Sequence, residues 1–228
     1  MDLLAFGDAG AQTVLLQPVD QRELAGMDRE LAALRAGFDG PVRLLALPVG
    51  DWNRELSPWP APPVFGREGF GGGGAQTLAA LLELCPADGR SYIPGGYSLA
   101  GLFALWAACQ SPRFAAVAAA SPSLWFPGFG DYVSAHPPRC SRVYLSLGDR
   151  EERSKNPVLA QVGHRVRALE AQLKARGTDC LLEWNPGNHF RDPELRSARA
   201  FAWVLNRLRQ EANKQTRPSS AAEPGGIQ

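Results

Sequence analysis

The chain has 228 residues, of which 45% are hydrophobic and 21% charged, a length and composition that suit one globular domain with its own core. The 24 Lys and Arg residues nearly balance the 23 Asp and Glu residues. Because nucleic acids and membrane surfaces usually select proteins with a basic excess, we expect neither as a partner. Gly and Pro, at 24 and 19 residues, are enriched but fall short of the share typical of low-complexity chains.

Short apolar runs alternate with helical periodicity along the chain. The runs predict buried strands at Thr13–Val19, Pro41–Val49, Phe114–Ala120, Arg142–Leu147 and Cys180–Trp184, with a stub at Tyr92–Ile93 that Pro94 interrupts. Apolar residues three and four apart predict helices through Leu24, Met27, Leu31 and Leu34, and at Gln76–Cys85, Gly101–Cys109, Val158–Arg176 and Pro193–Arg209. This alternation predicts an α/β protein with a mostly parallel sheet and helices on both faces.

The rest of the chain reads as irregular. Residues 50–75 and 122–138 are rich in Gly and Pro, and residues 211–228 have no apolar pattern. We therefore expect one domain over residues 1–210, two irregular segments that follow the carboxyl ends of strands, and a disordered tail over 211–228.

The cysteines and the N-terminus exclude several classes of protein. Cys85, Cys109, Cys140 and Cys180 lie far apart, so there is no CxxC pair, and we expect four reduced, mostly buried thiols and no metal or cofactor. The first residues lack a basic segment followed by an apolar run, and no run approaches the about 18 apolar residues of a membrane span. The sequence thus predicts a cytoplasmic protein with no signal peptide and no membrane partner. It carries no information on the oligomeric state.

The segment Gly96-Tyr97-Ser98-Leu99-Ala100 is the most informative. It nearly matches the G-x-S-x-G nucleophile elbow and lies where that motif is needed, after a strand and before an apolar helix. There a serine occupies a strained turn that exposes its hydroxyl, and small residues two positions before and after let the helix pass close to the strand. The backbone N–H of Leu99, at the helix N-terminus, is in place to stabilise an oxyanion.

A serine nucleophile needs a base, and the chain has three histidines. His136 precedes two prolines in an irregular segment, and His164 falls inside a predicted helix. His189 instead follows the last predicted strand, where the catalytic groups of open α/β sheets gather. We expect His189 to be the base.

An orienting carboxylate is expected in the loop after strand 142–147, which carries Asp149, Glu151 and Glu152. The chain order of Ser98, acid and His189 is that of the α/β-hydrolases and differs from that of the two main serine-protease folds. The spacing alone leaves the choice among the three carboxylates open.

Aromatic residues in the irregular segments predict the walls of a substrate pocket. Trp52 and Trp59 lie in the first segment, Trp125 and Phe126 lie in the second, and Tyr97 precedes the proposed nucleophile. We expect these five side chains to bind an ester with an apolar or aromatic portion.

The runs Gly96–Ala104, Ser121–Trp125, Leu147–Glu152 and Gly187–Phe190 resemble the esterase branch of the α/β-hydrolase fold that includes siderophore (enterobactin-type) and feruloyl esterases. The resemblance covers residues 90–210 well and the first 90 residues loosely. It implies a mostly parallel sheet without a large cap domain.

The resemblance also implies a triad acid three residues after the loop glycine, which is Glu151, although some siderophore esterases work with a Ser–His dyad. It implies a second oxyanion donor after an early strand. This chain departs from the His-Gly-Gly-Gly pattern there, and since Pro18 has no N–H, we expect Val19 to donate beside Leu99.

Together these features predict a serine hydrolase that cleaves small-molecule carboxylic esters through an acyl-enzyme on Ser98, with no cofactor. Two alternatives stay open at this stage. An acyltransferase would use the same residues, and a non-catalytic binding protein could share the fold.

Overall fold

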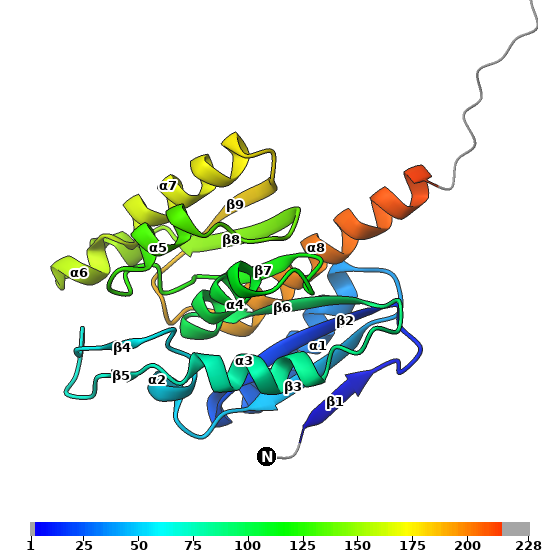
Figure 1. Ribbon diagram of the computed structural model, residues 1–228, viewed down its shortest axis with the longest axis horizontal. Helices are drawn as coiled ribbons and strands as arrows, with labels where there is room; N and C mark the ends of the chain where they lie inside the picture. The colour runs from blue at the N-terminus through cyan, green and yellow to red at the C-terminus, as the bar shows by residue number, and fades with distance from the viewer. Residues whose placement is uncertain (1–2, 216–228) are drawn as a thin grey trace, which may run out of the picture.

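A seven-stranded sheet in the order β1-β3-β2-β6-β7-β8-β9 organises the computed structural model, which describes residues 3–215 (Figure 1). Its strands are β1 (Leu4–Gly7), β2 (Thr13–Val19), β3 (Arg43–Pro48), β6 (Ser91–Tyr97), β7 (Val117–Ala120), β8 (Arg142–Gly148) and β9 (Asp179–Asn185). Neighbouring strands are parallel, except that β1 runs antiparallel to β3 at the sheet edge. A separate hairpin joins β4 (Pro60–Ala61) and β5 (Phe70–Gly71).

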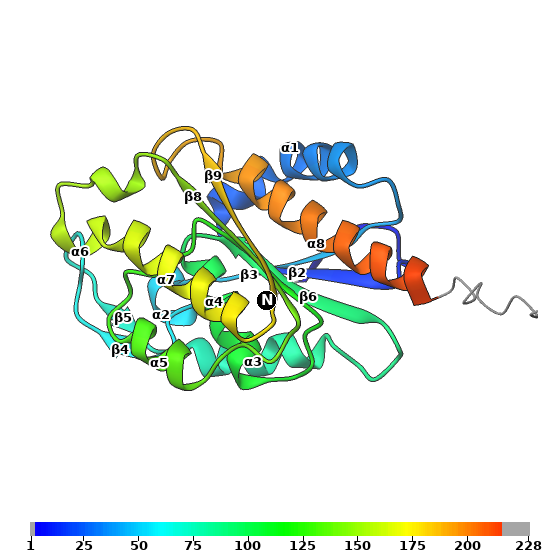
Figure 2. The ribbon, with the colours of Figure 1, turned by 90° about the horizontal axis from the view of Figure 1, so that it is seen from above.

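Helices cover both faces of the sheet (Figure 2). One face carries α1 (Gln21–Gly37) and α8 (Pro193–Gln215), and the other carries α3 (Gly74–Glu83), α4 (Leu99–Gln110), α5 (Phe129–Ala135) and α7 (Val162–Ala175). Three short helices lie in connections: α2 (Trp52–Glu55), η1 (Glu151–Arg153) and α6 (Pro157–Ala160). The sheet thus separates two apolar cores, as the alternating pattern predicted.

Helix α4 is apolar on every side, and all of its residues from Leu99 to Cys109 are buried. A helix without a polar face must be covered all round. It packs on β6 and β7, and the core on its side of the sheet also includes residues of α3, α5 and α7. This cover fixes the position of the residue that precedes α4, which is Ser98.

The order of the strands places a crevice between β2 and β6. The chain leaves β2 through α1 to reach β3, then crosses to β6 on the other side of β2 and leaves β6 through α4. Because α1 and α4 cover opposite faces, the connections diverge at the carboxyl ends of β2 and β6. Ligands of open α/β sheets bind at such a switch point.

The structure differs from the predicted elements at several places. Strand β1 has no counterpart in the prediction, and α5 lies inside the segment 122–138 that was expected to be irregular. The predicted helix Val158–Arg176 is divided into α6 and α7 at Gln161. Helix α8 continues to Gln215, so residues 211–215 of the predicted disordered tail are helical. Residues 216–228 of that tail lie outside the described residues.

Pro94 does not interrupt a strand, contrary to expectation. The ladder between β2 and β6 ends at the pair Leu16 and Pro94, and the ladder between β6 and β7 begins at Gly95. The missing N–H of Pro94 therefore falls where β6 exchanges one partner strand for the other, and β6 runs through to Tyr97.

All four cysteines are buried free thiols, as expected. Within residues 3–215, the helices are either too short or too polar to cross a membrane.

Candidate active site

Ser98 lies on a strained turn between β6 and α4. Its backbone has φ 58° and ψ −118°, a region that L-residues avoid unless the surrounding structure enforces it. Three hydrogen bonds hold the turn: Ser98 N–H donates to the Ala120 carbonyl (3.0 Å), and the Ser98 carbonyl accepts from Leu102 N–H (3.1 Å) and Ser123 N–H (3.1 Å). This is the geometry expected of a nucleophile elbow.

The small residues of the motif are required by close approach. A Cβ atom at Gly96, whose φ is +142°, would lie 2.8 Å from Ala100 Cβ. A Cβ atom at Gly101 would lie 3.0 Å from the Gly96 carbonyl oxygen. The alanine in place of the last motif glycine is therefore accommodated because Gly96 and Gly101 leave the room around it.

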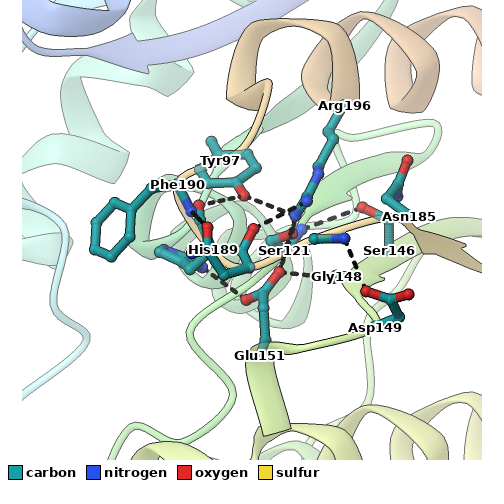
Figure 3. A network of polar contacts seen from close by, with 12 residues as sticks. Tyr97, Ser121, Ser146, Gly148, Asp149, Glu151, Asn185, His189, Phe190 and Arg196 are labelled. Carbon is teal, nitrogen blue, oxygen red and sulfur yellow. Dashed lines mark hydrogen bonds and ion pairs between the residues drawn. The ribbon is translucent and has the colours of Figure 1, made fainter. Parts of the chain in front are cut away.

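Ser98, His189 and Glu151 form a continuous chain of hydrogen bonds. Ser98 Oγ lies 2.9 Å from His189 Nε2. His189 Nδ1 lies 2.7 Å from Glu151 Oε2 (Figure 3). The three residues come from the elbow, the loop after β9 and the loop after β8, as the sequence placed them. In this arrangement His189 can accept the hydroxyl proton at Nε2 while Nδ1–H donates to the carboxylate.

The other two carboxylates of the β8 loop face elsewhere. Asp149 Oδ1 accepts from the backbone N–H of Gly187 (2.7 Å), so it braces the histidine loop and does not bind the imidazole. Glu152 forms an exposed ion pair with Arg167 (2.8 Å). Among the three candidates, Glu151 is the residue that the fold brings to His189.

The second oxygen of Glu151 is saturated with donors. Oε1 accepts from Gly148 N–H (2.7 Å), Ser121 Oγ–H (2.9 Å) and Arg196 Nη1–H (2.9 Å), and the residue is only 9% exposed (Figure 3). Burial alone would raise the pKa of the Glu151 carboxyl, but the hydrogen bonds from His189, Gly148 and Ser121 outweigh it and hold the pKa below its ordinary value. Glu151 is therefore ionised at neutral pH. Neither Ser121 nor Arg196 is among the site residues predicted from the sequence, although Ser121 begins one of the runs that carry the family resemblance.

Ser98 and His189 open into a cavity of about 1380 Å³. The aromatic residues of its lining are Trp52, Phe65, Phe70, Tyr97, Trp125 and Phe190. Phe65, Phe70 and Trp125 pack edge-on or tilted against one another, with ring centroids 5.5–6.4 Å apart. Phe190, which follows His189, is 85% exposed at the mouth.

Two predicted pocket residues lie behind this lining, which corrects the expectation. Trp59 donates from Nε1 to the Pro127 carbonyl (3.0 Å) and packs on Phe126 and Tyr132. Phe126 is fully buried. Both support the wall from the protein side, whereas Trp52, Tyr97 and Trp125 line the cavity as predicted.

Two turns bring backbone N–H groups to the site. Leu99 is the first residue of α4, so its N–H has no acceptor within the helix. Val19, predicted as the second donor, is fully buried at the end of β2 and does not line the cavity. The next residue, Asp20, does line it.

The Asp20 N–H has an acceptor in the structure. It donates to Glu23 Oε2 (3.1 Å) in the capping box that begins α1. Burial raises the pKa of the Glu23 carboxyl to about 9, so this acceptor is a neutral carboxyl at pH 7.

The described residues contain no cluster of metal-ligating side chains. Over residues 3–215, no group of three or more His, Cys, Asp or Glu side chains could hold a metal ion.

Sequence comparison finds one distant relative. No protein-family model matches the chain. The uncharacterised protein YbbA of Bacillus subtilis (strain 168) is 27% identical over an alignment of 139 positions, which covers 54% of this chain and 55% of that protein. The match thus spans about half the length of the curated relative.

Structural comparison identifies the fold. An IroE-like serine hydrolase from Shewanella oneidensis aligns with a TM-score of 0.69 at 14% identity, covering 90% of this chain and 75% of that one. Siderophore hydrolase EstA from Aspergillus nidulans aligns with a TM-score of 0.62 at 18% identity, covering 90% and 94%. The enterobactin esterase Fes from Shigella flexneri aligns with a TM-score of 0.60 at 18% identity, covering 90% and 55%.

These likenesses show the α/β-hydrolase fold, and the expected fold class is confirmed. They also confirm that the structural neighbours of this chain include siderophore and enterobactin esterases, as its motifs predicted.

Proposed function

We propose that the protein is a serine hydrolase of carboxylic esters in which Ser98, His189 and Glu151 form the catalytic triad. One observation carries the proposal. An unbroken chain of hydrogen bonds, 2.9 and 2.7 Å long, joins the Ser98 hydroxyl on a strained turn to the buried, ionised carboxylate of Glu151. A hydroxyl with that support, open to a large cavity, is an activated nucleophile.

The reaction follows from these contacts. Ser98 Oγ attacks the ester carbonyl carbon while its proton passes to His189 Nε2, and Glu151 stabilises the imidazolium through Nδ1–H. The tetrahedral intermediate collapses, the bond to the alcohol oxygen breaks, and His189 returns the proton to the leaving alcohol. A water molecule, deprotonated by His189, then cleaves the acyl-enzyme and restores the Ser98 hydroxyl.

The developing oxyanion needs backbone donors, and we assign the Leu99 N–H as the first. The second is the Asp20 N–H, which must exchange its present acceptor, the Glu23 carboxyl, for the oxyanion. The exchange is favourable because a hydrogen bond to a charged oxygen is stronger than one to a neutral carboxyl. Because the pKa of Glu23 is raised to about 9, that carboxyl is neutral at pH 7.

The lining favours esters with an aromatic portion. Phe65, Phe70 and Trp125 form a packed wall, and Phe190 offers an exposed ring beside His189. Two structural neighbours carry related names: the Shigella protein is an enterobactin esterase, studied with 2,3-dihydroxy-N-benzoyl-serine, and the Aspergillus protein is a siderophore hydrolase. We propose small-molecule aromatic esters as the substrate class.

A fluorophosphonate probe tests the nucleophile. The wild-type protein should gain one covalent adduct by intact mass, and Ser98→Ala should gain none. Ser123→Ala is the matched control because Ser123 Oγ lies 3.2 Å from Ser98 Oγ yet makes no contact with His189 among the hydrogen bonds of residues 3–215; it should still be labelled. Equal labelling of Ser98→Ala, or none of the wild type, would leave a hydrolase fold that binds without turnover.

The substrate class is tested with matched esters. The wild-type protein should have a higher kcat/KM for an aryl-acid ester than for the acetate of the same alcohol. Trp125→Ala should reduce this preference about tenfold, because it removes a ring from the wall. Equal preference in both proteins would exclude Trp125 from substrate binding.

A further inference from the structure

Arg196 is a buried cation beside the site. It lies in the first turns of α8, and its residue is only 2% exposed. Arginine is almost never buried this fully unless its donors are paired. The guanidinium of Arg196 has acceptors on two separate loops, so its role extends beyond a single ion pair.

One nitrogen of this guanidinium serves the acid. Nη1 donates to Glu151 Oε1 (2.9 Å) and to Ser121 Oγ (3.1 Å), and Ser121 in turn donates to the same carboxylate oxygen (2.9 Å). A side chain at Gly148 would place its Cβ atom 3.0 Å from Nη1 and 2.9 Å from Glu151 Oε1, so the glycine leaves the space that this contact needs. With Oε1 taken up, Oε2 is the oxygen left for the histidine.

The other nitrogen serves the histidine loop. Nη2 donates to the carbonyls of Pro186 (3.2 Å) and Asn188 (3.0 Å). Nη1 also donates to Tyr97 Oη (3.1 Å), whose hydroxyl donates to the His189 carbonyl (2.8 Å). The loop that carries His189 is therefore held at three carbonyls, two directly by Arg196 and the third, that of His189, through Tyr97 (Figure 3).

We propose that Arg196 is a positioning residue that ties the loop of Glu151 to the loop of His189 and so sets the contact between the two. This inference rests on the proposed hydrolase function. Arg196 neither touches Ser98 nor lines the cavity among the contacts of residues 3–215, so it acts through the residues that it binds around the acid and the histidine.

The chemistry of the side chain explains why arginine occupies the position. The planar guanidinium presents two nitrogens at fixed angles, so it can bind a carboxylate and two carbonyls at once. A lysine ammonium at the same place could neutralise Glu151 but could not span both loops. Arg196 therefore makes two separable contributions: its positive charge, and the pair of nitrogens that reaches both loops.

Three variants separate them: Arg196→Met, which removes both contributions, Arg196→Lys, which keeps the charge, and Arg199→Met as a matched control. Arg199 is on the same helix with a 55% exposed side chain, and it binds Glu183 and Asn185. We expect kcat to fall about 10- to 100-fold in Arg196→Met with a smaller change in KM. Arg196→Lys should lie between Arg196→Met and the wild type, and Arg199→Met should stay within about twofold.

A second readout does not depend on activity. The proton between His189 Nδ1 and Glu151 should give a downfield proton resonance in protein labelled with ¹⁵N-histidine, and His189→Ala identifies it among the three histidines. We expect Arg196→Met to lose this resonance to solvent exchange and Arg199→Met to keep it. A merely structural role would lower the yield or the melting temperature of Arg196→Met while folded protein kept both kcat and the resonance.

Different results would overturn the positioning role of Arg196 and the proposed hydrolase function. Wild-type kcat and an intact resonance in Arg196→Met, or in Arg196→Lys if the former does not fold, would overturn the positioning role. A wild-type protein that cleaves no ester would remove the proposed function. The resonance in the variants would still test whether Arg196 sets the contact between His189 and Glu151.

Discussion

Two buried glutamates of this protein differ in the sense of their pKa shifts. Glu151 and Glu30 are 9% and 2% exposed, so both residues are shielded from solvent. The pKa of Glu151 lies below its ordinary value, whereas burial raises that of Glu30 to about 8. Burial therefore cannot by itself explain the state of either group.

The number of donors explains the difference. Glu151 accepts hydrogen bonds from four residues on four different parts of the chain: Ser121, Gly148, His189 and Arg196. Glu30 accepts one, from Gln17 Nε2 (3.2 Å), and within residues 3–215 its Oε1 has no partner. The nearby carboxylate of Glu194 raises the pKa of Glu30 further. A buried carboxylate is thus ionised only where the fold gathers enough donors around it.

The largest expected effect comes from Glu151→Gln. The Gln oxygen would be drawn to the Oε1 donors, so its amide would present an N–H to His189 Nδ1 and favour the wrong imidazole tautomer. We expect kcat for a p-nitrophenyl ester to fall about 10³- to 10⁴-fold, as expected when a triad acid becomes an amide. Steady-state kinetics measure this directly.

Glu152→Gln is the matched control for that change. Its carboxylate is exposed and pairs with Arg167, so kcat should stay within about twofold. Similar losses in the two variants would show that the acid loop matters only for its overall charge. A small loss in Glu151→Gln alone would favour a Ser–His dyad.

The second prediction concerns stability and uses Glu30→Gln. Because the pKa of folded Glu30 is about 8 against an ordinary 4.5, the native state keeps a proton that the unfolded chain releases. Wild-type stability should therefore fall as pH rises from about 4.5 to 8, at a rate of up to about 1.4 kcal/mol per pH unit from this group. Glu30→Gln lacks that slope. The difference between the free energy of unfolding of Glu30→Gln and that of the wild type should therefore shift in favour of the variant as pH rises over this range.

Chemical denaturation at pH 5, 6.5 and 8 checks this result, with Asp28→Asn on the exposed side of the same helix as control. Glu151 has the opposite linkage: the stability from its lowered pKa is present above the ordinary value and is lost as pH falls through the folded value. A constant difference between Glu30→Gln and the wild type at all three pH values would mean that Glu30 is ionised and solvated.

Residue type and position at strand ends were enough to predict Ser98 and His189 of the proposed triad and to confine the acid to the loop after β8, whereas Glu151 was chosen among the three carboxylates of that loop by the family resemblance. Ser98, His189 and Glu151 each follow a recognisable strand, and parallel strands deliver such residues to one edge of the sheet. Arg196 was missed because a single arginine in an amphipathic helix looks like a surface residue. It does lie four and eight residues before the fully buried Ala200 and Val204, a spacing that places it on the buried face of α8.

The pocket walls were harder to predict because their backbone has no period. In a regular strand or helix the spacing tells which side chains point inward, but in residues 50–75 and 122–138 it does not. Every tryptophan of these segments was therefore predicted to line the pocket, including Trp59, which packs behind the wall. Phe65 and Phe70, which do line it, were not predicted. The hairpin of β4 and β5 places Phe70, and its two-residue strands leave no pattern in the sequence.

The smallest expected effect tests how many donors Glu151 needs. Ser121→Ala removes one of the three donors to Oε1 and leaves Gly148, Arg196 and His189 in place. Since the carboxylate keeps most of its hydrogen bonds, we expect kcat to fall only about two- to fivefold. Because Glu151 loses one hydrogen bond that favours its charged form, its pKa should rise, and the acidic limb of the pH–rate profile should move to higher pH. Ser146→Ala is the control, because Ser146 Oγ accepts from the Ser121 N–H (3.2 Å) without touching Glu151. A loss as large as that of Glu151→Gln would mean that the carboxylate of Glu151 is close to the state of Glu30, with no donor to spare.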